Sequence, residues 1–212
     1  MKLEYVKPDE IEKRSFEIID EECRARGFAP LPDDLRPIVY RAIHTTADFD
    51  YYENLKFSPD VVPYAHKLLR NGATIVTDTN MGRAGINQTA LRKLGCEAFC
   101  YMADPEVAAA AKEAGTTRAA ASVDRAAALP GPVIYAVGNA PTALIRLYER
   151  ITEGTFRPAL VIAAPVGFVN VVAAKEMIME TDVPYIAAAG RKGGSNLAAA
   201  LVNALMYEAL KA

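Results

Sequence analysis

From residue 73 onward, the chain alternates short apolar runs with longer Ala-rich amphipathic segments, and this alternation limits its possible folds most strongly. Apolar runs of five or six residues are typical of parallel strands that are covered on both faces. The predicted strands are 73–77, 96–101, 132–137, 159–164 and 184–188. The predicted helices are 104–128, broken near Gly115, and then 140–152, 168–181 and 195–210. This order predicts an α/β fold, a three-layer αβα sandwich with a mostly parallel sheet of about five strands.

The segment before residue 73 predicts helices and loops. One helix begins near Pro8, whose ring suits a first turn, and ends at Gly27. A second helix is predicted at about 35–46, and a third runs from Ser58 to about Gly72. Between these two, the segment FDYYENLKFS predicts a loop.

Residues 1–212 are predicted to form a single domain. The sequence has no internal repeat, no low-complexity linker and no break in composition. Hydrophobic residues make up 51% of the chain, enough for a large core without disulfides or metals.

The charge of the chain is almost balanced, with 24 Lys and Arg against 26 Asp and Glu. A general nucleic-acid-binding protein normally has a strong basic excess, so the balanced charge argues against this class of protein. A small anionic ligand remains compatible with the composition, because a few well-placed basic residues suffice to bind it.

The cysteines and the N-terminus indicate where the protein works. Cys23, Cys96 and Cys100 are odd in number and lack metal-ligand spacing, so we expect packing thiols in a reducing compartment. The N-terminus lacks the apolar region of a secretory signal, and no run of about 18 uncharged apolar residues is present. We therefore expect a cytoplasmic protein that has no membrane partner and no metal site.

Four loops follow predicted strands, where ligands bind in open α/β sheets. They are TDTNMGRAGIN (77–87), GNAP (138–141), PVGFVN (165–170) and GRKGGSN (190–196). Their Gly, Asn, Thr and Ser residues expose backbone N–H groups and offer small polar contacts. Ordinary turn chemistry is the alternative explanation for any single loop.

Of the two histidines, His44 is the stronger candidate for chemistry. It follows Arg41 by three residues on a predicted helix, so both side chains project to the same side. Asp48 and Asp50 follow the helix, where either could orient the imidazole. A surface position without a function is the alternative for His44, and His66 is expected to be structural.

Two further features are compatible with an anionic ligand. Ser15 places a hydroxyl on the inward face of the first helix, although the hydroxyl can instead bond its own i−4 carbonyl. GRKGGSN places two cations in a glycine-rich loop ahead of a helix N-terminus, which suits an anion. Neither a Walker A spacing, a dinucleotide fingerprint nor a Gly-x-Ser-x-Gly nucleophile elbow occurs.

Six motifs in order resemble those of the precorrin-8X methylmutases, from about residue 8 to the C-terminus. They are RSFEIIDEE (14–22), RAIHTTADFD (41–50), ENLKFS (53–58), TDTNMGRAGIN (77–87), PVGFVN (165–170) and GRKGGSN (190–196). The resemblance implies an isomerase of cobalamin biosynthesis, which moves a methyl group from C-11 to C-12 of precorrin-8X or cobalt-precorrin-8. The shift needs no cofactor, and members of the family are homodimers.

The resemblance also implies roles for individual residues. His44 matches the family's proton donor and acceptor, and Arg41 and Ser15 match residues that contact the substrate. The other substrate-binding positions that we assign from the motifs are Lys56, Thr77, Asp78, Thr79, Asn80, Arg83, Gly167, Asn170, Gly190, Arg191, Lys192, Gly193, Gly194, Ser195 and Asn196.

Two other functions compete with this interpretation. A non-catalytic protein that binds a tetrapyrrole or another anionic ligand would share the pocket but would not need His44. A phosphate- or nucleotide-handling α/β enzyme would use GRKGGSN, but the expected phosphate-binding spacings are absent.

Overall fold

The computed structural model describes residues 3–211, which contain one six-stranded sheet. The strands are β1 (Leu55–Phe57), β2 (Thr74–Thr77), β3 (Glu97–Phe99), β4 (Val133–Val137), β5 (Leu160–Ala163) and β6 (Tyr185–Ala188). Their order across the sheet is β1-β6-β5-β4-β2-β3. Strands β2 to β6 are parallel, and β1 pairs antiparallel with β6 at one edge. All five predicted strands are therefore confirmed, and the sheet has one strand more than expected.

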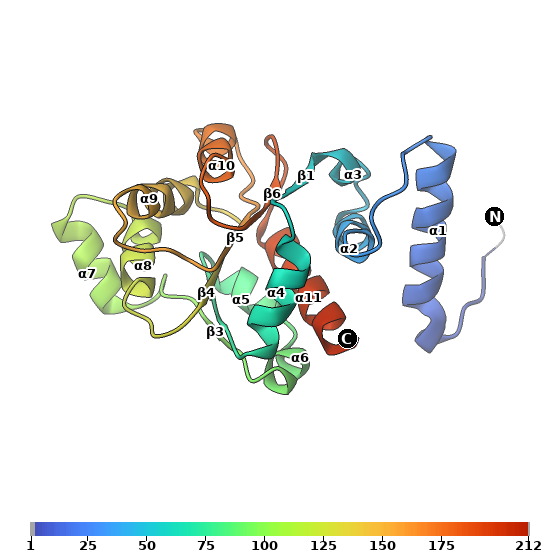
Figure 1. The fold of residues 1–212 in the computed structure, drawn as a ribbon, viewed down its shortest axis with the longest axis horizontal. Helices are drawn as coiled ribbons and strands as arrows, with labels where there is room; N and C mark the ends of the chain where they lie inside the picture. The colour runs from blue at the N-terminus through green and yellow to red at the C-terminus, as the bar shows by residue number, and fades with distance from the viewer. Residues whose placement is uncertain (1–2, 212) are drawn as a thin grey trace.

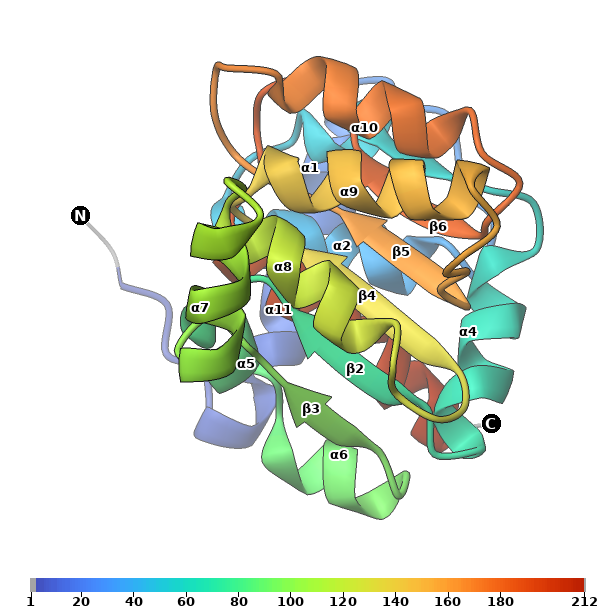
Figure 2. The same cartoon turned by 90° about the vertical axis from the view of Figure 1, so that its left-hand side faces the viewer.

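Helices cover both faces of the sheet, which confirms the three-layer αβα sandwich (Figures 1 and 2). The helical elements are η1 (Pro8–Glu10), α1 (Ile11–Ala25), α2 (Arg36–Thr46), α3 (Tyr51–Asn54), α4 (Val61–Arg70), α5 (Asn80–Gly85), α6 (Gln88–Lys93), α7 (Pro105–Glu113), α8 (Arg118–Ala126), α9 (Pro141–Thr152), α10 (Val171–Met179) and α11 (Ser195–Lys211). Helices α8, α9 and α10 lie on one face, and α2, α4, α5 and α11 lie on the other. Each face has its own apolar cluster of buried residues.

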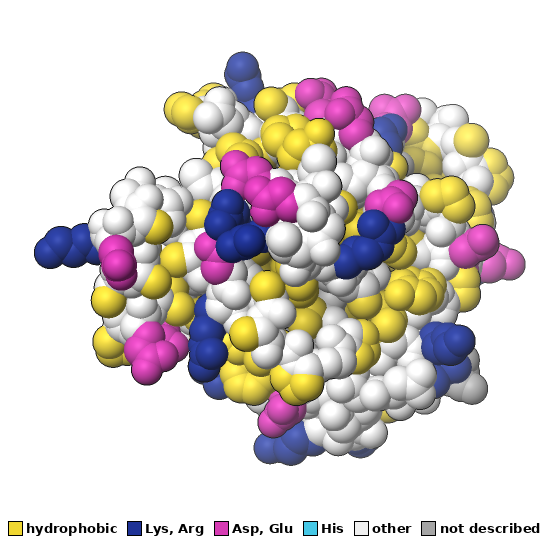
Figure 3. All heavy atoms as spheres, turned by 60° about the vertical axis from the view of Figure 1, so that its left-hand side comes forward, with side chains coloured by type: hydrophobic (Ala, Val, Ile, Leu, Met, Phe, Trp, Pro, Cys, Tyr) yellow, Lys and Arg dark blue, Asp and Glu magenta, His cyan; other side chains and the backbone are white. Residues whose placement is uncertain are grey.

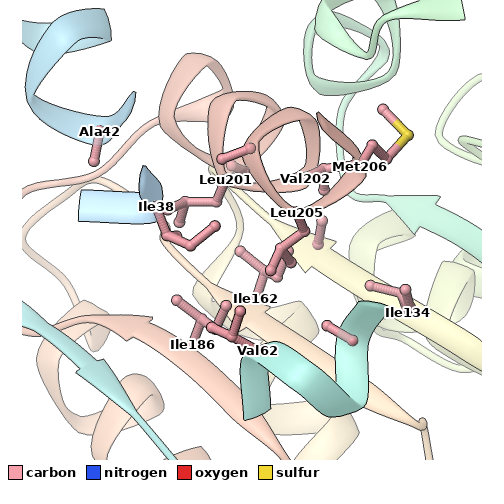
Figure 4. Packing of buried hydrophobic residues seen from close by; sticks show 14 of the residues in the cluster. Ile38, Ala42, Val62, Ile134, Ile162, Ile186, Leu201, Val202, Leu205 and Met206 are labelled. Carbon is pink, nitrogen blue, oxygen red and sulfur yellow. The ribbon is translucent and has the colours of Figure 1, made fainter. Parts of the chain in front are cut away.

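Helix α11 is the centre of the larger cluster (Figure 4). Its residues Leu201 and Leu205 are buried among Ile38 of α2, Val62 of α4 and Ile162 of β5. Full burial of one such side chain contributes about 1.5–3 kcal/mol, so this helix holds α2, α4 and the sheet together. The position of α2 is important because it carries Arg41 and His44.

Two segments of the sequence prediction are wrong. The predicted loop 49–58 forms α3 and then β1, whose three residues pair with β6 because the edge of the sheet offers free backbone groups. The predicted loop 77–87 contains the short helix α5, and α6 follows it in residues for which no element was predicted. Their N-termini are capped by the side chains of Thr79 and Asn87, which accept hydrogen bonds from backbone N–H groups. The predicted break near Gly115 is confirmed, since α7 ends before this residue and α8 begins after it.

Helix α1 lies at the edge of the molecule, separated from the sheet by α2 (Figure 1). It packs chiefly against α2 and leaves Ile11 and Ile18 exposed. On the side where α7, α8 and α9 lie, positive and negative side chains are interspersed (Figure 3). Within residues 3–211, no helix is long and apolar enough to cross a membrane.

Candidate active site

Asp78 connects two of the loops at the carboxyl edge of the sheet. It follows β2, and its buried carboxylate accepts hydrogen bonds from the N–H groups of Gly138, Asn139 and Ala140 at 2.8, 2.8 and 2.7 Å. Burial raises the pKa of Asp78, while the three donors act to lower it. The carboxylate therefore fixes the GNAP loop, and all three of these contacts are internal to the protein.

The two threonines beside Asp78 also hold the loops together. The Oγ1 atom of Thr79 lies 2.7 Å from Oγ of Ser195, at the start of α11, and accepts a hydrogen bond from the N–H of Gly82. The hydroxyl of Thr77 donates to the carbonyl of Thr79. The TDTN and GRKGGSN segments, separated by more than a hundred residues, thus meet at this edge of the sheet.

Close backbone packing explains two glycines in these loops. A Cβ atom on Gly193 would lie 2.2 Å from the carbonyl oxygen of Ala164, and one on Gly138 would lie 2.5 Å from Cα of Ser195. Both distances are too short for any side chain. The GRKGGSN loop is therefore pressed against the end of β5 and against the GNAP loop.

Lys192 connects the GRKGGSN loop to the end of α2. Its ammonium lies 2.6 Å from carboxylate oxygens of both Asp48 and Asp50. These ion pairs raise the pKa of Lys192, and they correct our expectation that Asp48 or Asp50 orients the imidazole of His44. Both carboxylates bind the cation because the loop after β6 approaches the end of α2 in the fold.

Arg41 and His44 lie together on α2 against Phe16 of α1. The imidazole of His44 packs edge-to-face on the Phe16 ring at a centroid distance of 5.6 Å, and it is exposed in the single chain. The guanidinium of Arg41 lies between the rings of Phe16 and Tyr207, at 5.0 and 5.2 Å from their centroids. These two rings fix the position of the guanidinium.

The carboxylate of Glu12, on α1, forms an ion pair with the guanidinium of Arg41. Its two carboxylate oxygens accept hydrogen bonds from Nη1 and Nη2 at 3.0 and 2.7 Å, a bidentate arrangement. The hydrogen bond from Arg41 lowers the pKa of Glu12, and the positive charges of Arg41, His44 and Lys211 act in the same direction. Arg41 is thus arranged to bind a carboxylate beside His44.

Two cavities lie beside Phe16 and Glu12, and Arg41 lines one of them. One, of about 340 Å³, is lined by Arg41, Phe16, Glu12, Asn87 and Tyr207 among others, and the other, of about 620 Å³, lies between α1 and α2. Both volumes are within the usual range for small-molecule sites. Among the described residues, His44 lines neither cavity. Phe16 lines both cavities, and its ring contacts the imidazole of His44.

Several residues assigned from the motifs lie elsewhere or make local contacts. The hydroxyl of Ser15 donates to the carbonyl of Ile11, the i−4 bond considered above. The exposed Lys56 on β1 donates to the carbonyl of Glu53, and Nε of Arg83 donates to the carbonyl of Ala98 in β3. Within residues 3–211, no hydrogen bond joins any of these three side chains to Arg41 or His44.

The remaining assigned residues follow β2, β5 and β6. Asn80, Asn170, Arg191 and Asn196 are exposed, and the guanidinium of Arg191 lies 5.4 Å from the centroid of the exposed Phe168 ring. The glycines are Gly167, Gly190 and Gly194, each with a positive φ. These residues form a rim of polar groups and one aromatic ring at the carboxyl edge of the sheet.

Sequence reasoning missed Lys175, which lies beneath the GRKGGSN loop. Its side chain is fully buried, and Nζ donates to the carbonyls of Gly190 and Lys192 at 2.8 and 2.9 Å. Burial lowers the pKa of Lys175 to about 8. A signal was present in the sequence, since Lys175 follows the buried Val171 by four residues on α10. Within residues 3–211, no group of three or more His, Cys, Asp or Glu is arranged to hold a metal ion.

The comparisons with known proteins agree with the motifs. A family model described as precorrin-8X methylmutase matches residues 10–208. The cobalt-precorrin-8 methylmutase of Salmonella typhimurium is 43% identical, with 94% of this chain and 95% of the relative covered. The precorrin-8X methylmutase of Pseudomonas aeruginosa is 36% identical, with 97% and 99% covered.

A solved structure extends the likeness to three dimensions. The precorrin-8X methyl mutase from Thermus thermophilus is 42% identical and superposes with a TM-score of 0.85, covering 95% of this chain and 98% of that one. The motifs, the matched length and the shared fold lead to one conclusion: the chain belongs to the precorrin-8X methylmutase family, whose members are isomerases that transfer a methyl group within one molecule.

Proposed function

We propose that this protein converts precorrin-8X, or its cobalt complex, to hydrogenobyrinate or cobyrinate by moving a methyl group from C-11 to C-12. The main supporting observation is the pair of neighbours on α2. Arg41 holds a carboxylate in a bidentate arrangement, and the exposed imidazole of His44 lies one turn further along the helix. A carboxylate of the macrocycle, which carries seven, replaces Glu12 on this guanidinium when the substrate binds.

His44 acts as the proton donor and acceptor in this proposal. Protonation of the conjugated macrocycle makes it electron-poor, which assists the 1,5-sigmatropic shift of the methyl group to the adjacent carbon. The proton then returns to the imidazole, so the protein is unchanged after each turnover. Imidazole exchanges protons near neutral pH, and a positioned acid of this kind contributes about 10²–10⁴ in rate.

The rim of the site holds the anionic edge of the macrocycle. Arg191 is an exposed cation of the GRKGGSN loop, and the backbone N–H groups of that loop add neutral donors. Lys192 shares its charge with Asp48 and Asp50, so we assign it to the attachment of the loop to α2 as well as to substrate binding. Ser15 and the polar residues after β2 and β5 complete the proposed binding set.

We propose in addition that the protein works as a cytoplasmic homodimer. Apolar side chains at two places support the dimer: Ile11 and Leu3 near α1, and Met81, Phe168 and Val169 at the carboxyl edge of the sheet, are 52–90% exposed in the single chain. His44 is exposed beside α1, so a second chain packed there would enclose it. Sedimentation of the purified protein at twice its mass of 22.9 kDa would support this part of the proposal.

Turnover of the substrate tests the proposed function. Purified protein is mixed with precorrin-8X or its cobalt complex, and the visible spectrum is followed as the chromophore of the product forms. We expect His44→Ala to lower kcat by about 10²–10⁴ and Arg191→Ala chiefly to raise KM.

His66→Gln is the matched control, because the other histidine lies half-buried on α4, away from the loops that carry the motifs. We expect the kcat of this variant to be close to that of the wild type. Binding of the substrate without any conversion would contradict the proposal and favour a tetrapyrrole-binding protein instead.

A further inference from the structure

Among residues 3–211, the buried cation Lys175 has no acidic partner. No atom of its side chain reaches solvent, and its two hydrogen bonds go to the main-chain carbonyls of Gly190 and Lys192. Burial alone lowers its pKa to about 8, with no contribution from a charged group of the neighbouring α9, β5, β6 or the loop. A buried charge without a counter-ion costs free energy, and an apolar side chain of the same length would avoid this cost.

The two hydrogen bonds of Lys175 fix the direction of two peptide groups. In a trans peptide, the N–H of a residue points away from the preceding carbonyl. Because the carbonyls of Gly190 and Lys192 point inward to the ammonium, the N–H groups of Arg191 and Gly193 point away from it. Neither N–H donates a hydrogen bond to any acceptor in residues 3–211.

The rest of the loop is fixed by other contacts. The carbonyl of Arg191 accepts a hydrogen bond from the N–H of Gly167, and the N–H of Gly194 donates to the carbonyl of Ala164. The side chain of Lys192 is held by Asp48 and Asp50. The free donors of the loop are therefore held in place before any ligand arrives, which limits the ordering cost of binding.

We propose that Lys175 is a positioning residue, which orients the GRKGGSN loop so that the N–H groups of Arg191 and Gly193 bind a carboxylate of the tetrapyrrole. This inference rests on the proposed function, because it concerns how the same substrate is held. The two acidic residues on Lys192 neutralise its charge, so the ammonium of Lys175 supplies the compensating charge beneath the bound carboxylate.

Lys175→Met tests the positioning role, because methionine fills the space but removes the charge and the donors. We expect KM for precorrin-8X to rise about tenfold or more, as for the loss of charge-assisted hydrogen bonds, with kcat changed less than about twofold. Lys67→Met, at an exposed lysine on α4, is the control and leaves both constants unchanged. If the wild type is active and Lys175→Met has an unchanged KM, this inference is overturned while the proposed function stands.

Proton uptake provides a second measurement, which a purely structural role would not affect. A carboxylate bound above Lys175 raises the pKa of the ammonium, which is about 8 in the free protein. The wild type therefore takes up a proton when hydrogenobyrinate binds at pH 8.5. Calorimetric titration in buffers of different ionisation enthalpy measures this uptake, and Lys175→Met should lack it. If the variant does not fold, the wild type alone decides, because binding without proton uptake contradicts the proposal.

Discussion

Asp78 shows how much of the site depends on a single carboxylate. Its three hydrogen bonds satisfy three consecutive N–H groups of the GNAP loop, which would otherwise remain unpaired beside the start of α11. Burial raises the pKa of Asp78, and these donors act in the opposite direction by favouring the charged form. The residue was assigned to substrate binding from the motif, and its observed contacts give it a supporting role for the loops.

We expect Asp78→Ala to lower the free energy of unfolding by about 3 kcal/mol, since each buried donor left unpaired costs about 1–3 kcal/mol and water reaches some of them. Urea unfolding followed by circular dichroism measures this loss, because the chain has no Trp for fluorescence. Asp33→Ala is the control, since the Asp33 side chain is 94% exposed, and its effect stays within about 0.5 kcal/mol. Equal midpoints for the two variants would disprove the supporting role of Asp78.

At the scale of elements, the position of the GRKGGSN loop depends on close backbone packing against the end of β5. A Cβ atom on Gly193 would overlap the carbonyl oxygens of Ala164 and Pro165, at 2.2 and 2.6 Å, so the loop must move. We expect Gly193→Ala to weaken product binding about 10–100-fold, because the displaced loop loses hydrogen bonds to a charged group, each of which contributes about 1.5–3 kcal/mol. Titration of the product, followed by absorbance, measures the affinity.

Gly190→Ala is the matched control in the same loop. Gly190 has a φ of +78°, and an added Cβ would meet nothing within 4 Å, so the only cost is backbone strain of about 1–2 kcal/mol. We expect its affinity for the product to fall much less than that of Gly193→Ala. The opposite order would show that strain, and not the contact with Ala164, governs the loop.

The apolar runs of the five parallel strands were predictable, whereas β1 and the short helices α3, α5 and α6 were not. Strands such as β4 and β5 are buried over their whole length, so their sequences carry a clear signal. Strand β1 has only Leu55, Lys56 and Phe57, and it forms because β6 offers it an edge, which no local pattern reveals. Helix α5 contains Gly82 and Gly85, which disfavour a helix locally, and Thr79 compensates as its N-cap.

The candidate site could be predicted only as a set of loops and one helix. The position of His44 beside Arg41 follows from helical spacing. The ion pairs from Lys192 to Asp48 and Asp50, and from Arg41 to Glu12, depend on which elements become neighbours in the fold. Lys175 was missed because a lysine is normally expected at the surface of a helix.

At the scale of the whole molecule, a chain with a net charge of −2 is proposed to bind a polyanion. The net negative charge of the protein does not attract a polyanion, so individual cations at the site must bind it. Salt screens exposed and buried cations to different extents. The Debye length falls from about 30 Å at 0.01 M salt to about 3 Å at 1 M, which weakens exposed charges such as Arg191 more than buried ones. The two kinds of cation can therefore be separated by ionic strength.

We expect KM for precorrin-8X to rise with added NaCl in the wild type while kcat stays nearly constant, because binding is electrostatic and the methyl shift is intramolecular. Arg191→Ala should start from a higher KM and show a weaker salt dependence, since the exposed cation is already absent. Initial rates measured across this range of NaCl check both expectations. Parallel salt curves for the two proteins would mean that Arg191 does not meet the substrate, and the carboxylates would then be held by Arg41 and by the backbone donors above Lys175.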